Sequence, residues 1–231
     1  MSSGELNAGA RRARREARTE AVVVLAIDVG LLVGLASVDK AKGWEIIDLP
    51  WWAWLLLATP ALLLMMLLLA FPGAGLRPGW VRNVGIALLG LLVASDAVAV
   101  GVLVVALATS STDGLSAGDL LAHGTVVWPT NIITFGLLFW LLDEGGPRVR
   151  AERGRPDPDF GFPQDAVPRA GWSPRLSDYL YVALTNAIAF SPTDTMPLTR
   201  RAKGLLAAES LISYVVVILV VARAVNVLGA S

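Results

Sequence analysis

The stretch that decides the fold is residues 179–228, which read YLYVALTNAIAFSPTDTMPLTRRAKGLLAAESLISYVVVILVVARAVNVL. A mostly apolar segment, 179–190, is followed by a polar turn at 191–195 and by a long apolar helix predicted over 205–228. A bilayer crossing needs about 20 residues, so the first segment has the length of a half-helix, a re-entrant element or a buried helix. Irregular backbone inside a membrane must be buried by protein or line a watery cavity. The stretch therefore has the outline of an ion-pore hairpin.

Four further apolar runs precede this stretch, which excludes an ordinary soluble domain. The chain has 231 residues, of which 55% are hydrophobic and 16% charged. The runs cover residues 21–38, 51–71, 84–109 and 125–142. We predict an all-α, polytopic transmembrane helical bundle with five to six membrane segments and a C-terminal channel-like helix-turn-helix hairpin.

Polar stretches divide the chain into four parts. Residues 1–20 are predicted to form a basic cytoplasmic N-terminal segment, and residues 21–142 four transmembrane helices. Residues 143–175 are rich in Pro, Gly, Arg and Asp, which predicts an irregular, polar cytoplasmic loop. Residues 176–231 form the channel-like hairpin, with a short helix, a Ser-Pro-Thr-Asp turn and a long terminal helix.

Positive charge predicts which side of the membrane each end occupies. Five Arg in the first 20 residues place the N-terminus in the cytoplasm. If all six segments cross, 14 Lys and Arg lie inside and 5 outside; if residues 179–190 enter and return, the division is 16 to 3. The count does not separate the two arrangements, and we favour six crossings with both termini inside. Sixteen Arg against three Lys indicate a high-GC bacterial genome and hence a bacterial plasma membrane.

The tail resembles the post-filter turn and inner helix of bacterial two-span-type potassium channels. The positions that carry this resemblance are Pro197, Thr199, Glu209, Ala222 and Arg223. The resemblance implies a cation-conducting, or degenerate potassium-channel-like, pore subunit that works as a homo-oligomer.

The same alignment places the turn where the channels have their filter. The pore and ion-site residues that it implies are Ser191, Thr193 and Asp194. Only Asp194 matches the filter's Gly-Tyr-Gly-Asp, and a potassium filter needs glycines whose positive φ turns the carbonyls inward. A selective potassium filter is therefore not expected. The charges place the start of residues 179–190 on the cytoplasmic side, opposite to the channels, so this segment either crosses as a fifth helix or enters from the cytoplasm as an inverted pore loop.

The whole chain resembles a family of uncharacterised bacterial integral membrane proteins, known as a domain of unknown function. The shared motifs are Gly43-Trp44, Phe162-Pro163, Asp178-Tyr179 and the turn Thr193-Asp194-Thr195. This resemblance implies a multi-pass membrane protein and carries no known activity.

Four charged residues lie inside predicted spans, where each costs about 2.5–3.5 kcal/mol and needs a partner or a watery cavity. With both termini inside, Asp28 and Arg223 share a depth of about 8–10 Å, so we predict that they pair; alternatively, Arg223 extends to the headgroups. Asp96 lies near mid-bilayer and is a candidate ion or proton site. The alternative is a neutral Asp96 hydrogen-bonded to Ser95, Asn131 or Thr134.

The two remaining acids of the hairpin also have two interpretations. Glu209 is predicted to line a cavity near the turn, or else to be an interfacial residue one turn from Lys203. Asp194 is predicted to be a cation ligand at a pore mouth, or else a turn residue that caps a helix.

Catalysis and nucleic-acid binding have no support in the sequence. The chain has no Cys and zero net charge, and it shows no nucleophile–base pair, phosphate loop or metal-ligand spacing. We expect no enzyme activity and no cofactor. The single His, His123, is predicted to be structural or solvated, and small residues of the third run, such as Gly90 and Gly101, are predicted to pack helices closely.

The leading functional prediction is thus an ion-channel-like pore subunit. The alternatives are a secondary or proton-coupled transporter that uses Asp28, Asp96 and Glu209, and a non-conducting membrane scaffold. Membrane lipids, monovalent cations or protons, and further copies of the chain are the expected partners.

Overall fold

The computed structural model describes residues 3–44, 46, 49–71, 80–108, 117–147, 149, 157–167, 172–192 and 194–229. The described chain is almost wholly helical, which confirms the predicted all-α class. Its helices are α1 (Ser3–Lys42), α2 (Ala53–Ala70), α3 (Trp80–Ala108), α4 (Ala117–Leu142), α6 (Leu176–Ala189) and α7 (Arg200–Gly229). Two short strands, β1 (Phe160–Gly161) and β2 (Met196–Pro197), pair antiparallel, and the turns η1 (Asp143–Gly145) and η2 (Pro163–Asp165) are 3-10 helices.

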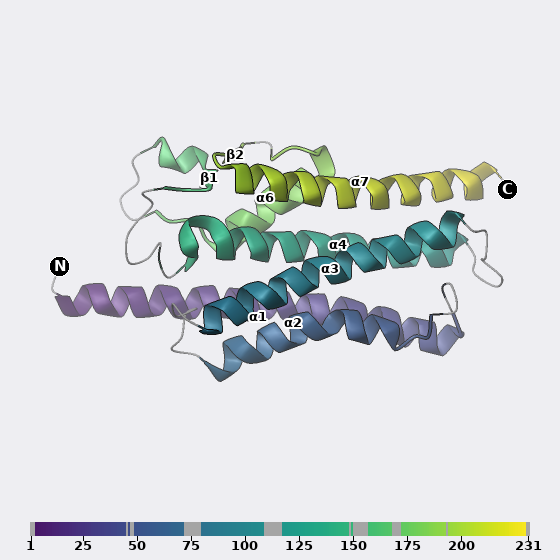
Figure 1. Ribbon diagram of the computed structural model, residues 1–231, viewed down its shortest axis with the longest axis horizontal. Coiled ribbons are helices and arrows are strands. Elements are labelled where there is room, and N and C mark those ends of the chain that lie inside the picture. Colours follow the sequence, from purple (N-terminus) through teal and green to yellow (C-terminus); the bar gives the residue numbers. More distant parts are fainter. Residues whose placement is uncertain are drawn as a thin grey trace.

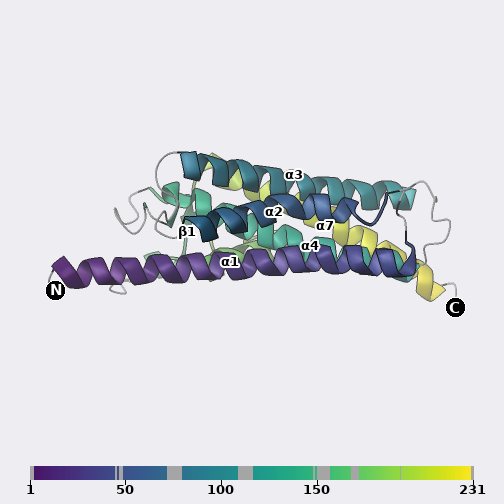
Figure 2. The same ribbon diagram turned by 90° about the horizontal axis from the view of Figure 1, so that it is seen from below.

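Five of these helices are long and apolar enough to cross a membrane, so the chain is a multi-pass integral membrane protein. The spans are Arg15–Lys42, Ala53–Ala70, Trp80–Ala106, Leu121–Gly145 and Arg200–Val221. Helices α1, α3 and α7 run in one direction and α2 and α4 in the other, so the two termini lie at opposite ends of the bundle (Figures 1 and 2). We call these the N-terminal end and the far end.

The expectation of six crossings with both termini on one side is therefore wrong. Helix α6 has 14 residues, or about 21 Å at 1.5 Å per residue, which is too short to cross. It begins at the N-terminal end, where Arg175 lies 3.5 Å from Glu16 of α1. It ends beside the middle of α7, where the rings of Phe190 and Tyr214 are 5.3 Å apart, and the chain then returns to pair β2 with β1. Helix α6 is thus a half-helix whose chain enters and leaves at the same end of the bundle, an arrangement that we call re-entrant.

Local sequence explains both ends of α6. The carboxylate of Asp178 accepts a hydrogen bond from the main-chain N–H of Arg175 (2.7 Å), which caps the first turn and suits the positive end of the helix dipole. Phe190 has a left-handed backbone (φ 53°), a conformation that ends helices, and Pro192 prevents the helix from resuming.

Helix α4 is the centre of the bundle. Of its span, 67% is buried, against 22–33% for the other four spans, and it packs against α1, α3, α6 and α7. Gly136 allows α6 to approach closely, because a Cβ at this position would lie 3.1 Å from Cα of Leu180.

Two small residues of α3, Gly90 and Gly101, do not pack helices as predicted. Gly90 and Gly101 face outward, and a Cβ on either would meet no atom within 4 Å in the described chain. The close approaches made by glycine are on α4 instead, at Gly124 and Gly136.

We predict that Gly136→Ala destabilises the protein by about 1–3 kcal/mol, because the new methyl group overpacks the contact with the main chain of Leu180. The matched control is Gly34→Ala on the exposed face of α1, where a Cβ meets nothing within 4 Å. Unfolding by SDS titration, followed by tryptophan fluorescence, measures both. Equal stability of the two variants would contradict the close approach.

Candidate functional site

Three buried carboxyl groups lie near the middle of three different spans. Asp28 of α1 is 0% exposed, Asp96 of α3 is 4% and Glu209 of α7 is 0%. Asp28 lies 13 positions after Arg15, the first residue of its span. It is therefore about 20 Å from this end of the span along the helix axis, deeper than the depth of about 8–10 Å expected from the sequence. The acids therefore form a layer in the middle of the bundle, far from either surface.

Asp28 and Asp96 form the acid pair, which carries the chemistry of this layer. The two carboxyl groups lie close enough to interact electrostatically across α1 and α3. Both oxygens of Asp28 and Oδ2 of Asp96 are buried and accept no hydrogen bond within the described part of the chain. Two negative charges in so dry a place repel one another strongly. A bound proton or monovalent cation removes that repulsion.

Helix α4 presents hydroxyl groups to the acid pair. Thr130 and Thr134 are fully buried and lie beside Asp96; Thr134 is one of the three partners named in the alternative interpretation of Asp96. Hydroxyl groups donate hydrogen bonds to carboxylates, and their oxygen atoms coordinate small cations. Oxygen atoms of α1, α3 and α4 are thus gathered around the acid pair.

Glu209 is held by the re-entrant helix. Asn186 of α6 donates from Nδ2 to Oε2 of Glu209 (2.8 Å) and to the main-chain oxygen of Leu206 (3.0 Å). Ser210 donates to Oδ1 of Asn186 (3.1 Å). Sequence analysis missed Asn186, although it is a lone amide in an apolar segment, seven positions after Tyr179 and so on the same helix face.

A single turn of α4 connects the two acidic regions. Asn131, between Thr130 and Thr134, donates from Nδ2 to Oγ of Ser213 on α7 (2.9 Å). Ser213 lies one turn after Glu209 on the same face. The resulting row of buried polar side chains, which we call the polar band, consists of Asp28, Asp96, Thr130, Thr134, Asn131, Ser213, Glu209 and Asn186. It crosses four spans and ends on α6.

The residues predicted at the pore turn lie apart from the acid pair. A groove of about 640 Å³ lies between α6, the turn that follows it and α7, and its lining includes Ser191, Asn186 and Ser210. Asp194 is exposed and accepts a hydrogen bond from Thr195 (3.3 Å), which fits the alternative of a turn residue. Thr193 lies outside the described residues.

The side chain of Arg223 also lies outside the described residues, so its predicted pairing with Asp28 stays a prediction. The shared depth that suggested this pairing is not observed. Asp28 lies at mid-span, whereas Arg223 lies six residues before the last residue of α7, Gly229.

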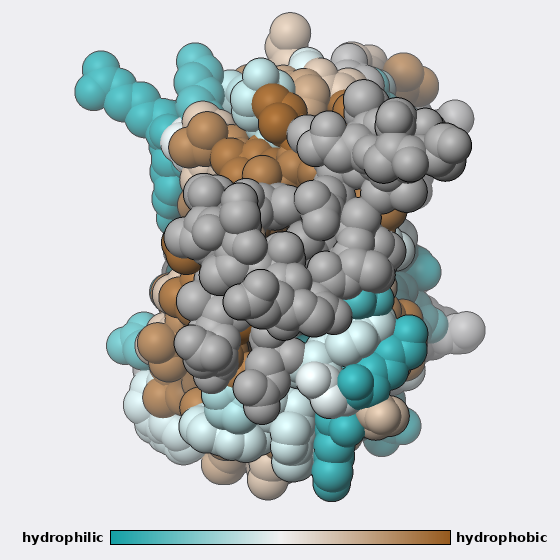
Figure 3. Space-filling view, turned by 90° about the vertical axis from the view of Figure 1, so that its right-hand side faces the viewer, coloured by the Kyte–Doolittle hydropathy of each residue, from teal (hydrophilic) through white to brown (hydrophobic). Residues whose placement is uncertain are grey.

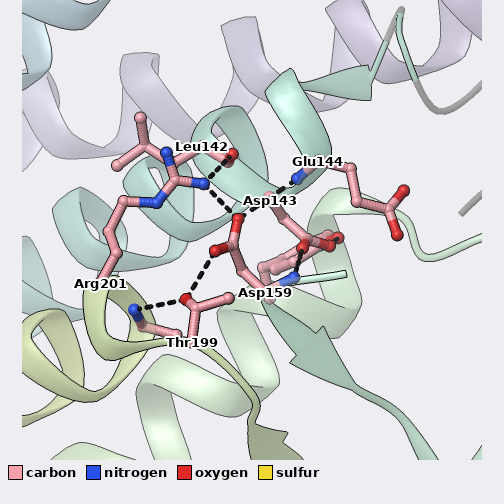
Figure 4. A network of polar contacts seen from close by, with 8 residues as sticks. Leu142, Asp143, Glu144, Asp159, Thr199 and Arg201 are labelled. Carbon is pink, nitrogen blue, oxygen red and sulfur yellow. Dashed lines mark hydrogen bonds and ion pairs between the residues drawn. The ribbon is translucent and has the colours of Figure 1, made fainter. Parts of the chain in front are cut away.

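The hairpin is fixed at the N-terminal end by the Asp159 network (Figure 4). Asp159 accepts hydrogen bonds from Thr199 Oγ1 (2.6 Å) and from the guanidinium of Arg201. Its own main-chain N–H donates to Oδ1 of Asp143 (2.7 Å), whose other oxygen accepts from the hydroxyl of Tyr179. The network thus joins the end of α4, the start of α6 and the start of α7.

This network corrects the expectation that residues 143–175 form only an irregular surface loop. Phe160 and Phe162 are 1% and 6% exposed and pack with Tyr179. The sequence does not reveal their burial, because two aromatic residues at and just after a two-residue strand do not form a periodic pattern.

Within the described residues, no group of three or more His, Cys, Asp or Glu side chains is arranged to hold a metal ion. No protein-family model matches this chain, and no curated protein and no solved structure is similar to it. The chemistry of the site is therefore argued from its geometry.

We predict that Asp159→Asn lowers the free energy of unfolding by about 1–2 kcal/mol, because the amide loses the charge-assisted bonds to Thr199 and Arg201. It also frees the hairpin, which limited proteolysis detects as faster cleavage near residues 190–199. Asp157→Asn, at an exposed position two residues earlier, is the matched control. A mutant as stable and as protease-resistant as this control would show that the network does not hold the hairpin.

Proposed function

We propose that this protein is a carrier for protons or monovalent cations, with the acid pair Asp28 and Asp96 as its ion site. The observation that supports the proposal is a pair of buried carboxyl groups at mid-span, of which both oxygens of Asp28 and Oδ2 of Asp96 accept no hydrogen bond in the described chain. Ionisable residues inside a membrane are rare because they are costly, and they mark ion pathways and proton relays. Carriers place such sites near the midplane of one chain's bundle.

The polar band supports movement of the ion beyond the acid pair. Its hydroxyl and amide groups place hydrogen-bonding atoms on α4, α6 and α7, with bonds from Asn131 to Ser213 and from Asn186 to Glu209. Such a row can pass a proton or replace part of the hydration shell of a small cation. Because α6 supplies Asn186, a movement of the re-entrant hairpin would change the contacts of Glu209.

The proposed setting is the plasma membrane of a bacterium with the N-terminus in the cytoplasm. With α6 re-entrant, 16 Lys and Arg fall on the N-terminal side and 3 on the other, which agrees with the positive-inside rule. The proposal assigns transport and no catalysis, with no cofactor and with membrane lipids as the surroundings.

We expect Asp28→Asn and Asp96→Asn each to lower proton or cation flux at least about tenfold, because each removes one charge of the site. The measurement is uptake into proteoliposomes driven by a potassium diffusion potential, with an internal pH dye for protons and radioactive sodium for Na⁺. Asp194→Asn, on the exposed turn, is the matched control and keeps the native rate. Native flux in both acid-pair variants would refute the carrier.

A second proposal is that the α6–α7 hairpin forms a cation-conducting pore between several copies of the chain. It is supported by the re-entrant form of the hairpin and by the outward exposure of Ser191 and Asp194. Non-helical backbone at membrane depth needs cover by protein or contact with water, and pores of this kind form around a symmetry axis. The carbonyl end of α6, which carries partial negative charge, borders the groove and favours cations.

The pore makes a prediction that differs from that of the carrier. Cysteine placed at Ser191 reacts with a water-soluble thiol reagent, native mass spectrometry of the purified protein gives an oligomer, and Asp194→Asn lowers single-channel conductance. Cysteine at the exposed Leu198 (53%) serves as the accessibility control. A monomer with an unreactive Ser191→Cys would exclude the pore, and the absence of both flux and conductance would leave a membrane scaffold.

A further inference from the structure

A second buried site lies at the far end of the bundle, about three helical turns from the acid pair. It consists of Asp39 near the end of α1, His123 near the start of α4 and Trp54 on α2, which are 2%, 0% and 4% exposed. Trp44 covers the imidazole, with ring centroids 5.9 Å apart, and Trp54 lies at 5.5 Å. Figure 3 views this end, where hydrophilic side chains (teal) stand at the rim among hydrophobic ones (brown).

The imidazole of His123 faces oxygen atoms on both sides. Nδ1 lies 2.6 Å from the main-chain oxygen of Asp119. Nε2 lies 3.0 Å from Oδ1 and 3.1 Å from Oδ2 of Asp39. Oδ2 also accepts a hydrogen bond from Nε1–H of Trp54 (2.7 Å).

These contacts require a proton between His123 and Asp39. A main-chain carbonyl only accepts hydrogen bonds, so Nδ1 carries a hydrogen. A neutral imidazole would then present a lone pair from Nε2 toward a carboxylate, which also carries lone pairs. The contact is favourable only if one more proton lies there, on Nε2 or on Asp39. The pair is therefore built to bind one proton.

Few other charges reach this pair. Asp119, one turn before His123 on α4, contributes its carbonyl group, and α2 contributes the neutral Trp54. The ammonium groups of Lys40 and Lys42 lie over the rings of Trp51 and Trp44, at 4.6 and 4.2 Å.

The pair is aligned with the acid pair on both helices. Asp28 and Asp39 are 11 residues apart on α1, and so are His123 and Thr134 on α4, which places each couple on one helix face about 16 Å apart. Between the two levels lie Leu32, Leu35 and Val127, which pack in one hydrophobic cluster. Two polar sites are thus separated by an apolar layer.

We propose that His123 and Asp39 form a proton-binding site that exchanges protons with the solution at the far end. That this site passes protons on to Asp28 and Asp96 rests on the proposed carrier function. That it binds a proton does not depend on the carrier function. His123 lies six residues after the start of α4 and Asp39 three residues before the end of α1, which is about 9 Å and about 5 Å from these helix ends along the axes.

The test uses the single histidine of the chain. The full-length protein, purified with a tag that contains no histidine and labelled with nitrogen-15 histidine, gives one imidazole signal pair in nuclear magnetic resonance spectra. We expect both ring nitrogens to report one reversible transition between about pH 5 and about pH 9. Signals that stay fixed over this range would overturn the proposal and leave a purely structural contact.

Two variants give opposite expected shifts. Asp39→Asn is expected to weaken proton binding about tenfold, because the imidazolium loses its carboxylate. Trp54→Phe keeps Asp39 but removes the indole N–H that donates to its Oδ2. The carboxylate then holds the shared proton more tightly. This variant tests the proposal if Asp39→Asn does not fold. A transition that neither variant moves would show that Asp39 does not share the proton.

Two further variants distinguish a failure of the carrier function from a failure of the proton site. Asp28→Asn is expected to stop proton uptake by proteoliposomes and to leave the His123 transition in place, whereas His123→Gln lowers uptake at least several-fold. A titrating His123 in a protein that moves no ions would refute the carrier while keeping the proton site. Uptake that is unchanged by His123→Gln would remove His123 from the path.

Discussion

Burial of polar groups against α4 is the constraint on which the rest of this structure depends. A membrane interior offers no water, so each buried polar side chain must find its partner inside the bundle. One turn of α4 serves two such needs, with Thr130 and Thr134 beside Asp96 and Asn131 bound to Ser213. This requirement explains why α4 is the most buried span and why α1, α3, α6 and α7 surround it.

The Asp159 network decides what the C-terminal hairpin is. Asp159 lies outside the spans, yet its bonds to Thr199 and Arg201 fix the start of α7 beside the end of α4. Because β1 then pairs with β2, the chain that leaves α6 must return to the end from which it entered. A half-helix held in this way supplies a polar residue, Asn186, to the middle of the bundle without crossing it.

An apolar layer separates two polar levels of the bundle. The acid pair and the pair His123–Asp39 occupy the same faces of α1 and α4, but Leu32, Leu35 and Val127 separate them. In the proposed carrier, an ion would pass between the levels only when water or a side-chain movement bridges this layer. Such a barrier distinguishes a carrier from an open pore, which needs a continuous wet path.

The sequence by itself determined the class of the protein, the five long spans, the short helix and the acids at membrane depth, because long apolar runs and the charges within them are local properties of the chain. Charge counts did not choose between five and six crossings, because both arrangements leave most Lys and Arg on the cytoplasmic side, as the positive-inside rule requires. Only the tertiary structure decided that α6 is re-entrant, that Asp28 faces Asp96, and that His123 meets Asp39. Those facts depend on which helix faces meet, and contacts between residues 68 or 84 positions apart leave no periodic signal in the sequence.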